Sequence, residues 1–181
     1  MDSERAQPPI LIRSQLAALL AFVWAALSYA VVLEPISRVF EEPIHANPLT
    51  AFGKAVMARM GTVQVVAAAL LLAVVIWVYI SRGRGDAQIH RLAVVPQAVI
   101  ALALLVELLM VVSWAVTLWS YSERDVAQLA AAHDVSLWPG DWHLQIAGGT
   151  ASLASAAALG VAAFFANPLA GGDRSRSGTT R

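Results

Sequence analysis

Four long stretches of apolar residues divide this chain, and each is long enough to cross a lipid bilayer. A spanning helix needs about 20 apolar residues, because each residue adds about 1.5 Å toward a hydrocarbon core about 30 Å thick. The pattern predicts helical spans at residues 14–33, 60–80, 92–118 and 144–166. The fold predicted from it is an all-α integral membrane protein, an antiparallel four-helix bundle with a short inner connection and short helices in the two outer connections.

The ends of two spans carry further expectations. Glu34 and Pro35 follow the first span, and a carboxylate and a residue without an amide donor both disfavour continuing in lipid. The first span is therefore expected to stop there, and its length is typical of a retained helix rather than a cleaved signal peptide. The third span is longer than one crossing needs, which predicts tilt, a kink near Pro96 or a first turn outside the bilayer.

Short helices are predicted in the two longer connections, which face the outer side. Asn47 and Pro48 form a helix-start signal, so a helix should lie on the second span or lead into it. Ser122 precedes Asp125 at the spacing of a capping box, which predicts a second short helix with an apolar face. Aromatic anchoring at the bilayer boundary is expected of five nearby residues: Trp114, Trp119, Tyr121, Trp138 and Trp142.

Arginine and lysine predict the orientation of these spans. Positively charged flanks resist translocation, and they are unevenly divided between the two sides. The inner side would carry Arg5, Arg13, Arg82, Arg84, Arg91, Arg174, Arg176 and Arg181, against Arg38, Lys54, Arg59 and Arg124 outside. We therefore expect a multi-pass protein of the plasma (inner) membrane with both termini cytoplasmic. Residues 1–168 form one membrane domain, and residues 169–181 a disordered cytoplasmic tail.

Composition excludes several other classes of protein. The chain is 59% hydrophobic and 13% charged, with a mean hydropathy of +0.66, which is too apolar for a soluble domain. Its formal net charge is zero, so nucleic acid is not an expected partner and the lipid bilayer is. The absence of cysteine excludes disulfides, thiolate metal sites and cysteine nucleophiles. No cofactor is expected, because haem would need histidines that face one another across the bundle.

Glu107 is the strongest candidate for chemistry, because it lies in the middle of the apolar run LALLVELLMVV. An ionised carboxylate costs at least a few kcal/mol there, and no span contains a Lys or Arg to pair with it. Either it is protonated or it faces a hydrated cavity. It could carry protons or contact a substrate, or it could be a neutral acid that helps helices pack. Trp114 shares its helix face, and Ser152 and Ser155 are expected at comparable depth on span four, where they can offer hydroxyls to Glu107. These three residues are the candidates for substrate contact or packing.

The histidines form a weaker group of candidates. His45, His133 and His143 all fall on the outer side of the predicted topology, where imidazole with carboxylate would suit zinc or copper(II). Their spacing matches no metal motif, so a metal site is not favoured. His143 differs from the others because it opens span four, and it is the second catalytic candidate after Glu107.

Span four is rich in small residues, which let neighbouring helix backbones approach closely. One row runs through Gly149, Leu153, Ala156 and Gly160, and a second through Gly148, Ser152, Ser155 and Leu159. Packing within the bundle is the preferred interpretation, and contact with a protein partner or a second copy is the alternative.

These features predict a structural or accessory component of a membrane assembly, because no complete catalytic set is present and an enzyme is not favoured. The alternative is a binder of small molecules or hydrophobic substrates, a transporter or a membrane enzyme. In that case Glu107 would be the intramembrane proton-carrying group, with His143 and Trp114 near the outer mouth of the bundle.

Four segments resemble a family of small four-helix bacterial membrane proteins, largely of unknown function, that is related to the anthrone-oxygenase-like proteins. They are VVLEPISRVF after span one, FGKAVMARMGTVQVVAAALLL entering span two, LWSYSERDVAQLAAAH after span three, and His143 at the start of span four. The similarity covers residues 16–165. It implies an antiparallel four-helix fold and, at most, a hydrophobic substrate or a lipid-facing role.

Overall fold

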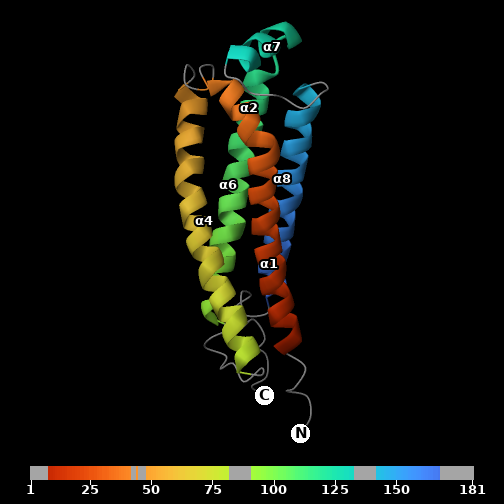
Figure 1. Cartoon of the computed structure of the whole chain (residues 1–181). Coiled ribbons are helices and arrows are strands. Elements are labelled where there is room, and N and C mark those ends of the chain that lie inside the picture. Colours follow the sequence, from red (N-terminus) through yellow and green to blue (C-terminus); the bar gives the residue numbers. More distant parts are fainter. Residues whose placement is uncertain (1–7, 42–43, 45–47, 82–90, 133–141, 168–181) are drawn as a thin grey trace, which may run out of the picture.

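The computed structural model describes residues 8–41, 44, 48–81, 91–132 and 142–167, and these are almost entirely helical, with no strand among them (Figure 1). The helices are α1 (Pro8–Ser28), a π-helical turn (Tyr29–Leu33), α2 (Glu34–Val39), α4 (Pro48–Ile80), α6 (Val94–Leu118), α7 (Glu123–Ala132) and α8 (Trp142–Phe165). The all-α class predicted from the sequence is confirmed. The tail at 169–181 lies outside the described residues.

Four of the helical runs are long and apolar enough to cross a membrane. They cover Ile12–Val39, Thr50–Ile80, Val94–Leu118 and Trp142–Phe165, with mean hydropathies between 1.5 and 2.6. Large apolar side chains such as Trp77 project outward from them instead of into a core. In water so much exposed apolar surface would be unfavourable, whereas lipid solvates it. The chain therefore has the features of a multi-pass helical membrane protein.

The first helical run continues past the point where the sequence predicts its end. The amide of Glu34 donates to the carbonyl of Tyr29, five residues back, and α2 follows directly. Pro35 occupies the first turn of α2, where no amide donor is required. The wider π-helical turn also gives the proline ring room beside the preceding turn. The helix therefore does not end at Glu34 and Pro35, and the end of the membrane span at this point stays a prediction.

Helix α4 is a single rod of 33 residues. The helix that begins at Pro48 leads directly into the second span, so one of the two predicted arrangements holds. A helix of this length is about 50 Å long, more than a bilayer core needs. Its first turns therefore extend beyond the apolar stretch, and they carry Lys54 and Arg59. In α6, Pro96 lies in the first helical turn, where a proline does not kink a helix.

The four long helices lie side by side, with α2 and α7 at one end and the start of α1 and the end of α8 at the other (Figure 1). Helix α8 packs closely on α1 and α6, and α6 packs closely on α4, whereas α1 and α4 touch far less. The row Gly149, Leu153, Ala156 and Gly160 is buried inside this arrangement. The preferred interpretation of the row, packing within the bundle, is confirmed.

Aromatic side chains close the end that carries α2 and α7. Phe40 packs edge-on against Tyr121 and also against Trp142, with ring centroids 5.3 Å apart in both pairs. The predicted cap of α7 is present, since Ser122 Oγ donates to Asp125 Oδ2 at 2.7 Å and accepts from the Asp125 amide at 3.3 Å. Val126 on the apolar face of α7 is buried beneath this layer.

Two of the five predicted boundary aromatics are not anchors. Trp114 and Trp142 are 1% and 3% exposed, so their rings fill the core instead of lying at a lipid surface. Trp119 is 53% exposed, which suits the predicted boundary role. Trp138 lies outside the described residues. The indole ring alone could not distinguish the two environments, because tryptophan is favoured in both.

The opposite end is joined by buried polar side chains. Asn167 Nδ2 donates to Gln97 Oε1 at 2.6 Å, and Gln97 Nε2 donates to Ser14 Oγ at 3.4 Å. All three residues are at most 4% exposed. These bonds tie α1, α6 and the end of α8 together.

Candidate functional site

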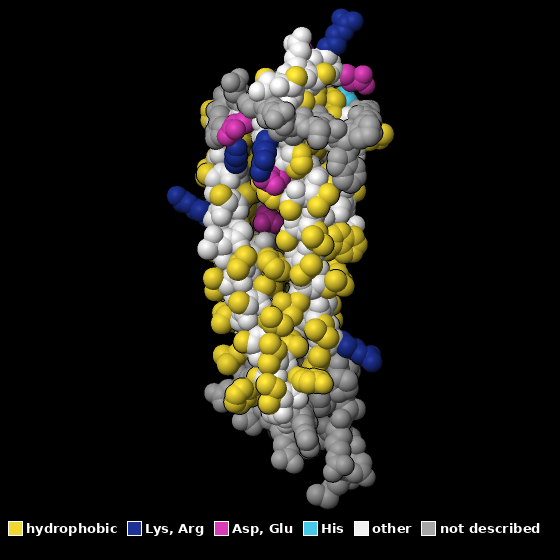
Figure 2. Space-filling view, in the orientation of Figure 1, with side chains coloured by type: hydrophobic (Ala, Val, Ile, Leu, Met, Phe, Trp, Pro, Cys, Tyr) yellow, Lys and Arg dark blue, Asp and Glu magenta, His cyan; other side chains and the backbone are white. Residues whose placement is uncertain are grey.

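Glu107 lies half-buried on α6 and faces a cavity between α1 and α4. The cavity has a volume of about 630 Å³ and opens to the side of the helix bundle; we call it the lateral cavity. Figure 2 shows an acidic side chain recessed in a hollow on this face of the molecule. The lining residues are Phe22, Ala25, Ala26, Tyr29, Lys54, Met57, Ala58, Gly61, Thr62, Gln64, Val65, Val66 and Glu107.

The lateral cavity exists because small residues face one another across the α1–α4 seam. Ala25 and Ala26 on α1 lie across from Ala58 and Gly61 on α4, and none of them can fill the space between the helices. A Cβ atom added to Gly61 would meet no atom within 4 Å. The bundle is therefore closed on three seams and hollow on the fourth.

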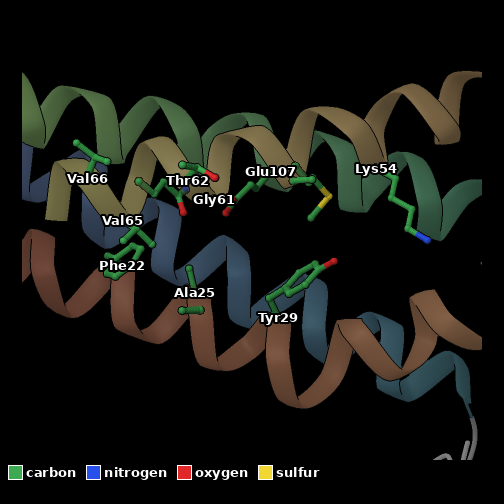
Figure 3. A pocket seen from close by; sticks show the side chains of 13 residues that line it. Phe22, Ala25, Tyr29, Lys54, Gly61, Thr62, Val65, Val66 and Glu107 are labelled. Carbon is green, nitrogen blue, oxygen red and sulfur yellow. The ribbon is translucent and has the colours of Figure 1, made fainter. Parts of the chain in front are cut away.

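The lateral cavity changes from polar to apolar along its length (Figure 3). Lys54 and Tyr29 lie toward one end, and Phe22 and Val65 toward the other, with Glu107 between them. The polar end is the one nearer α2. An amphipathic molecule would fit this gradient, with its polar group beside Glu107 and its apolar part between the helices.

Gln64 on α4 lines the lateral cavity beside Glu107. Gln64 is only 4% exposed, and its buried Nε2 atom has no hydrogen-bond partner among the described residues. The amide therefore lies beside the carboxyl with its donor capacity unused. Among the described residues no basic side chain forms a salt bridge with Glu107.

Charged side chains surround the polar end in pairs. Lys54 Nζ lies 3.4 Å from Glu41 Oε1, and Arg38 pairs with Glu34 on the next turn of its helix. Tyr29 lies beside the Ser37 side chain and within electrostatic range of the Glu34 and Glu107 carboxyls. These pairs leave the polar end of the lateral cavity nearly neutral, whereas Glu107 is the one acidic residue among those that line the cavity.

The structure does not bring the expected serines to Glu107. Ser152 Oγ shares a hydrogen bond of 2.7 Å with Ser28 Oγ and accepts one of 2.9 Å from Trp24 Nε1, so it joins α8 to α1. Ser155 Oγ donates to the carbonyl of Ala151 within its own helix, at 2.9 Å. The prediction of hydroxyl partners for Glu107 on α8 is wrong, because the carboxyl turns toward α4 and α1 instead.

Trp114 lies two turns from Glu107 on the same face of α6 but does not line the lateral cavity. Its Nε1 donates to the carbonyl of Thr50 at 3.4 Å, and its ring packs against α4 next to Gly53. Trp114 and Glu107 therefore share a face of α6, as predicted. The predicted role of Trp114 near the outer mouth of the bundle is wrong, because its buried indole closes the α4–α6 seam.

His143 lies at the start of α8, against two tryptophans. Its ring centroid is 4.0 Å from that of Trp142 and 4.7 Å from that of Trp119, and its Nε2 lies 3.4 Å from the Trp119 carbonyl oxygen. It does not line the lateral cavity. His45 and His133 fall outside the described residues, and the part of the chain that is described holds no cluster of three potential metal ligands.

Of the residues that line the lateral cavity, only Glu107 was predicted from the sequence as a site residue, and the missed ones include Tyr29, Gly61 and Gln64. Gln64 carries the clearest signal, because it is an amide within the otherwise apolar run VQVVAAALLL. Polar side chains in a span face the protein interior far more often than lipid. Gly61 and Tyr29 carry no such signal, because both types are common throughout spanning helices and near their ends.

Comparison of the chain with protein-family models, with curated proteins and with solved structures returns no match. Functional inference therefore depends on the geometry of the site alone.

Proposed function

We propose that this protein is an antiparallel four-helix membrane protein that binds a lipid-soluble small molecule in the lateral cavity. One observation carries the proposal: a half-buried carboxyl, Glu107, lies inside an otherwise mostly apolar cavity of about 630 Å³. Small-molecule sites in proteins are typically concave, mostly apolar and between about 300 and 1,000 Å³, with a few polar groups that orient the ligand. An intramembrane acid is itself a marker of such sites.

The position of the opening supports uptake from the bilayer. It lies between α1 and α4, whose outward faces carry exposed apolar residues such as Leu20 and Val66. A ligand dissolved in lipid can enter such an opening without crossing a polar surface. The cavity supports binding, and the groups around Glu107 do not form a set that would catalyse a reaction.

We place the bundle in the plasma membrane with both termini in the cytoplasm. The support is the excess of arginine on one side of the spans. Fusion of alkaline phosphatase and of a cytoplasmic reporter to the C-terminus tests this orientation. Activity of the cytoplasmic reporter alone is expected, and an active phosphatase fusion would reverse it.

An accessory role in a larger membrane assembly stays a prediction. The small-residue row of α8 on which a partner could dock is largely occupied by α1 and α6, and the second row includes Ser152, which bonds to α1. The relationship to the anthrone-oxygenase-like proteins also stays a prediction, and the lateral cavity suits the hydrophobic substrate that it implies.

Photolabelling with benzophenone, an uncharged lipophilic probe, tests the proposed function. In liposomes the labelled peptides should include the cavity-lining segments of α1 and α4. Gly61→Phe should abolish this labelling, because the new ring fills the cavity without meeting the backbone. Gly148→Phe is the matched control, since an added Cβ there also meets nothing within 4 Å but lies outside the cavity. Equal labelling of all three proteins would overturn the proposal.

A further inference from the structure

The two charged residues that line the lateral cavity, Lys54 and Glu107, do not form a salt bridge with each other. Lys54 already has an acidic partner outside the lining, because its Nζ lies 3.4 Å from Glu41 Oε1. Glu107, the only acidic residue among those that line the cavity, has no such partner among the described residues. A carboxylate between apolar helices interacts with a counter-charge more strongly than one in water, because the surroundings screen it weakly. A ligand that carries a positive charge would supply a counter-charge for Glu107.

Aromatic rings add a second reason to expect a cation. Phe22 and Tyr29 both project from α1 into the lateral cavity, on either side of the level of Glu107 (Figure 3). The face of an aromatic ring attracts organic cations, and the attraction grows when the cation is desolvated. A carboxyl flanked by aromatic and aliphatic side chains is a typical environment for an ammonium group with an apolar body.

From this geometry we infer that the ligand is a lipophilic organic cation, such as a hydrophobic amine or a quaternary ammonium or phosphonium ion. This inference rests on the proposed function and names the class of molecule that the cavity takes. The charged centre lies beside Glu107 and Tyr29, and the apolar body extends toward Phe22 and Val65. Gln64 places a buried amide beside this charged centre.

The test uses tetraphenylphosphonium and tetraphenylborate, two ions of nearly the same shape and opposite charge. Binding of radiolabelled tetraphenylphosphonium to the full chain in lipid nanodiscs is measured after subtraction of empty nanodiscs. Excess unlabelled tetraphenylphosphonium should displace it, and tetraphenylborate should not displace it from the protein-specific site. Displacement by both ions with equal affinity would show that the cavity does not select charge.

Variants of Glu107 assign the selectivity to its carboxyl. Glu107→Gln keeps the size of the side chain and should weaken tetraphenylphosphonium binding at least about tenfold, a loss equivalent to about 1.4 kcal/mol. Glu107→Asp should retain most of the binding. Glu123→Gln, which removes an exposed carboxyl from α7, should change nothing. Unchanged binding in Glu107→Gln would overturn the inference.

Binding should also weaken as pH falls, because tetraphenylphosphonium does not titrate while protonation neutralises the carboxylate. The charged or titratable groups that line the cavity with Glu107 are Tyr29 from α1 and Lys54 from α4, and Glu34 at the start of α2 lies within electrostatic range of Tyr29; α8 contributes none to the lining. The pH dependence should disappear in Glu107→Gln. A dependence that persists in this variant would point to Glu34 and contradict the assignment.

Benzophenone labelling separates failure of the inference from failure of the proposed function. If Glu107→Gln is still labelled in the cavity but the parent does not prefer the phosphonium ion, the cavity binds neutral ligands and only the inference fails. If neither probe reaches the cavity of the parent protein, both proposals fail. Should Glu107→Gln not fold, the phosphonium and borate comparison on the parent alone still decides the charge preference.

Discussion

Two glycines of the bundle have opposite surroundings. A Cβ added to Gly160 of α8 would lie 3.0 Å from Leu104 and 3.7 Å from the Ala21 side chain, whereas a Cβ added to Gly61 of α4 would meet nothing. Gly160 lies where α8 packs on α6 and α1, and Gly61 lines the lateral cavity. The same small residue thus permits close packing on one seam and leaves space on another. We expect stability to depend on the closed seams and ligand binding on the open one.

The largest loss of stability should follow from removing a large side chain from a tightly packed helix interface. Trp114→Ala removes a ring that is 1% exposed and its hydrogen bond to the Thr50 carbonyl, and large-to-small changes of this kind cost about 3–5 kcal/mol. Unfolding by SDS titration in mixed micelles measures the free energy. Trp77→Ala, at a site that is 59% exposed, serves as the control and should cost far less. Equal losses would mean that burial of Trp114 does not stabilise the bundle.

Overfilling the α8 seam should have the next largest effect. In Gly160→Leu the new side chain collides with Leu104, and overpacking costs about 1–3 kcal/mol. Gly148→Leu adds the same atoms where nothing lies within 4 Å and should leave the unfolding free energy nearly unchanged. The same titration compares the two proteins. If both variants lost stability equally, the close approach of α8 would not explain the result.

Removal of one hydroxyl that forms interhelical hydrogen bonds should lower the free energy of unfolding by a smaller amount. Ser152→Ala removes the bonds to Ser28 and Trp24 on α1, which predicts a loss of about 1 kcal/mol. Ser155→Ala removes only a bond to its own helix and is the matched control. A double-mutant cycle with Ser28→Ala should recover the coupling between the two hydroxyls. Additive losses in that cycle would contradict a direct bond.

The smallest expected effect is a gain of stability on the open seam. Gly61→Ala places a methyl group in free space and reduces the freedom of the unfolded chain, so the free energy of unfolding should rise by up to about 1 kcal/mol. The slightly narrower cavity should bind benzophenone more weakly than the parent does. A clear loss of stability would show that the cavity around Gly61 is filled in the folded protein.

The fold followed from the sequence because span length and hydropathy are properties of consecutive residues. The four apolar stretches, the capping pair Ser122 and Asp125, and the helix start at Pro48 each depend on neighbours within a few positions. The helix continues past the predicted end of the first span through a π-helical turn that precedes Pro35, and no residue pattern marks such a turn. Local signals therefore located the helices and most of their ends.

The sequence by itself also determined that Glu107 lies at mid-span and needs an explanation, since its depth is fixed by counting residues. Only the tertiary structure decided its neighbours. Depth suggested Ser152 and Ser155, but the rotation of α6 turns the carboxyl toward Gln64 and the α1–α4 seam, while Ser152 bonds to α1. The rotation of each long helix about its own axis depends on how all four pack together. The faces of these four helices are almost equally apolar. A one-dimensional pattern cannot encode which of several apolar faces meets which neighbour, and that choice created the lateral cavity.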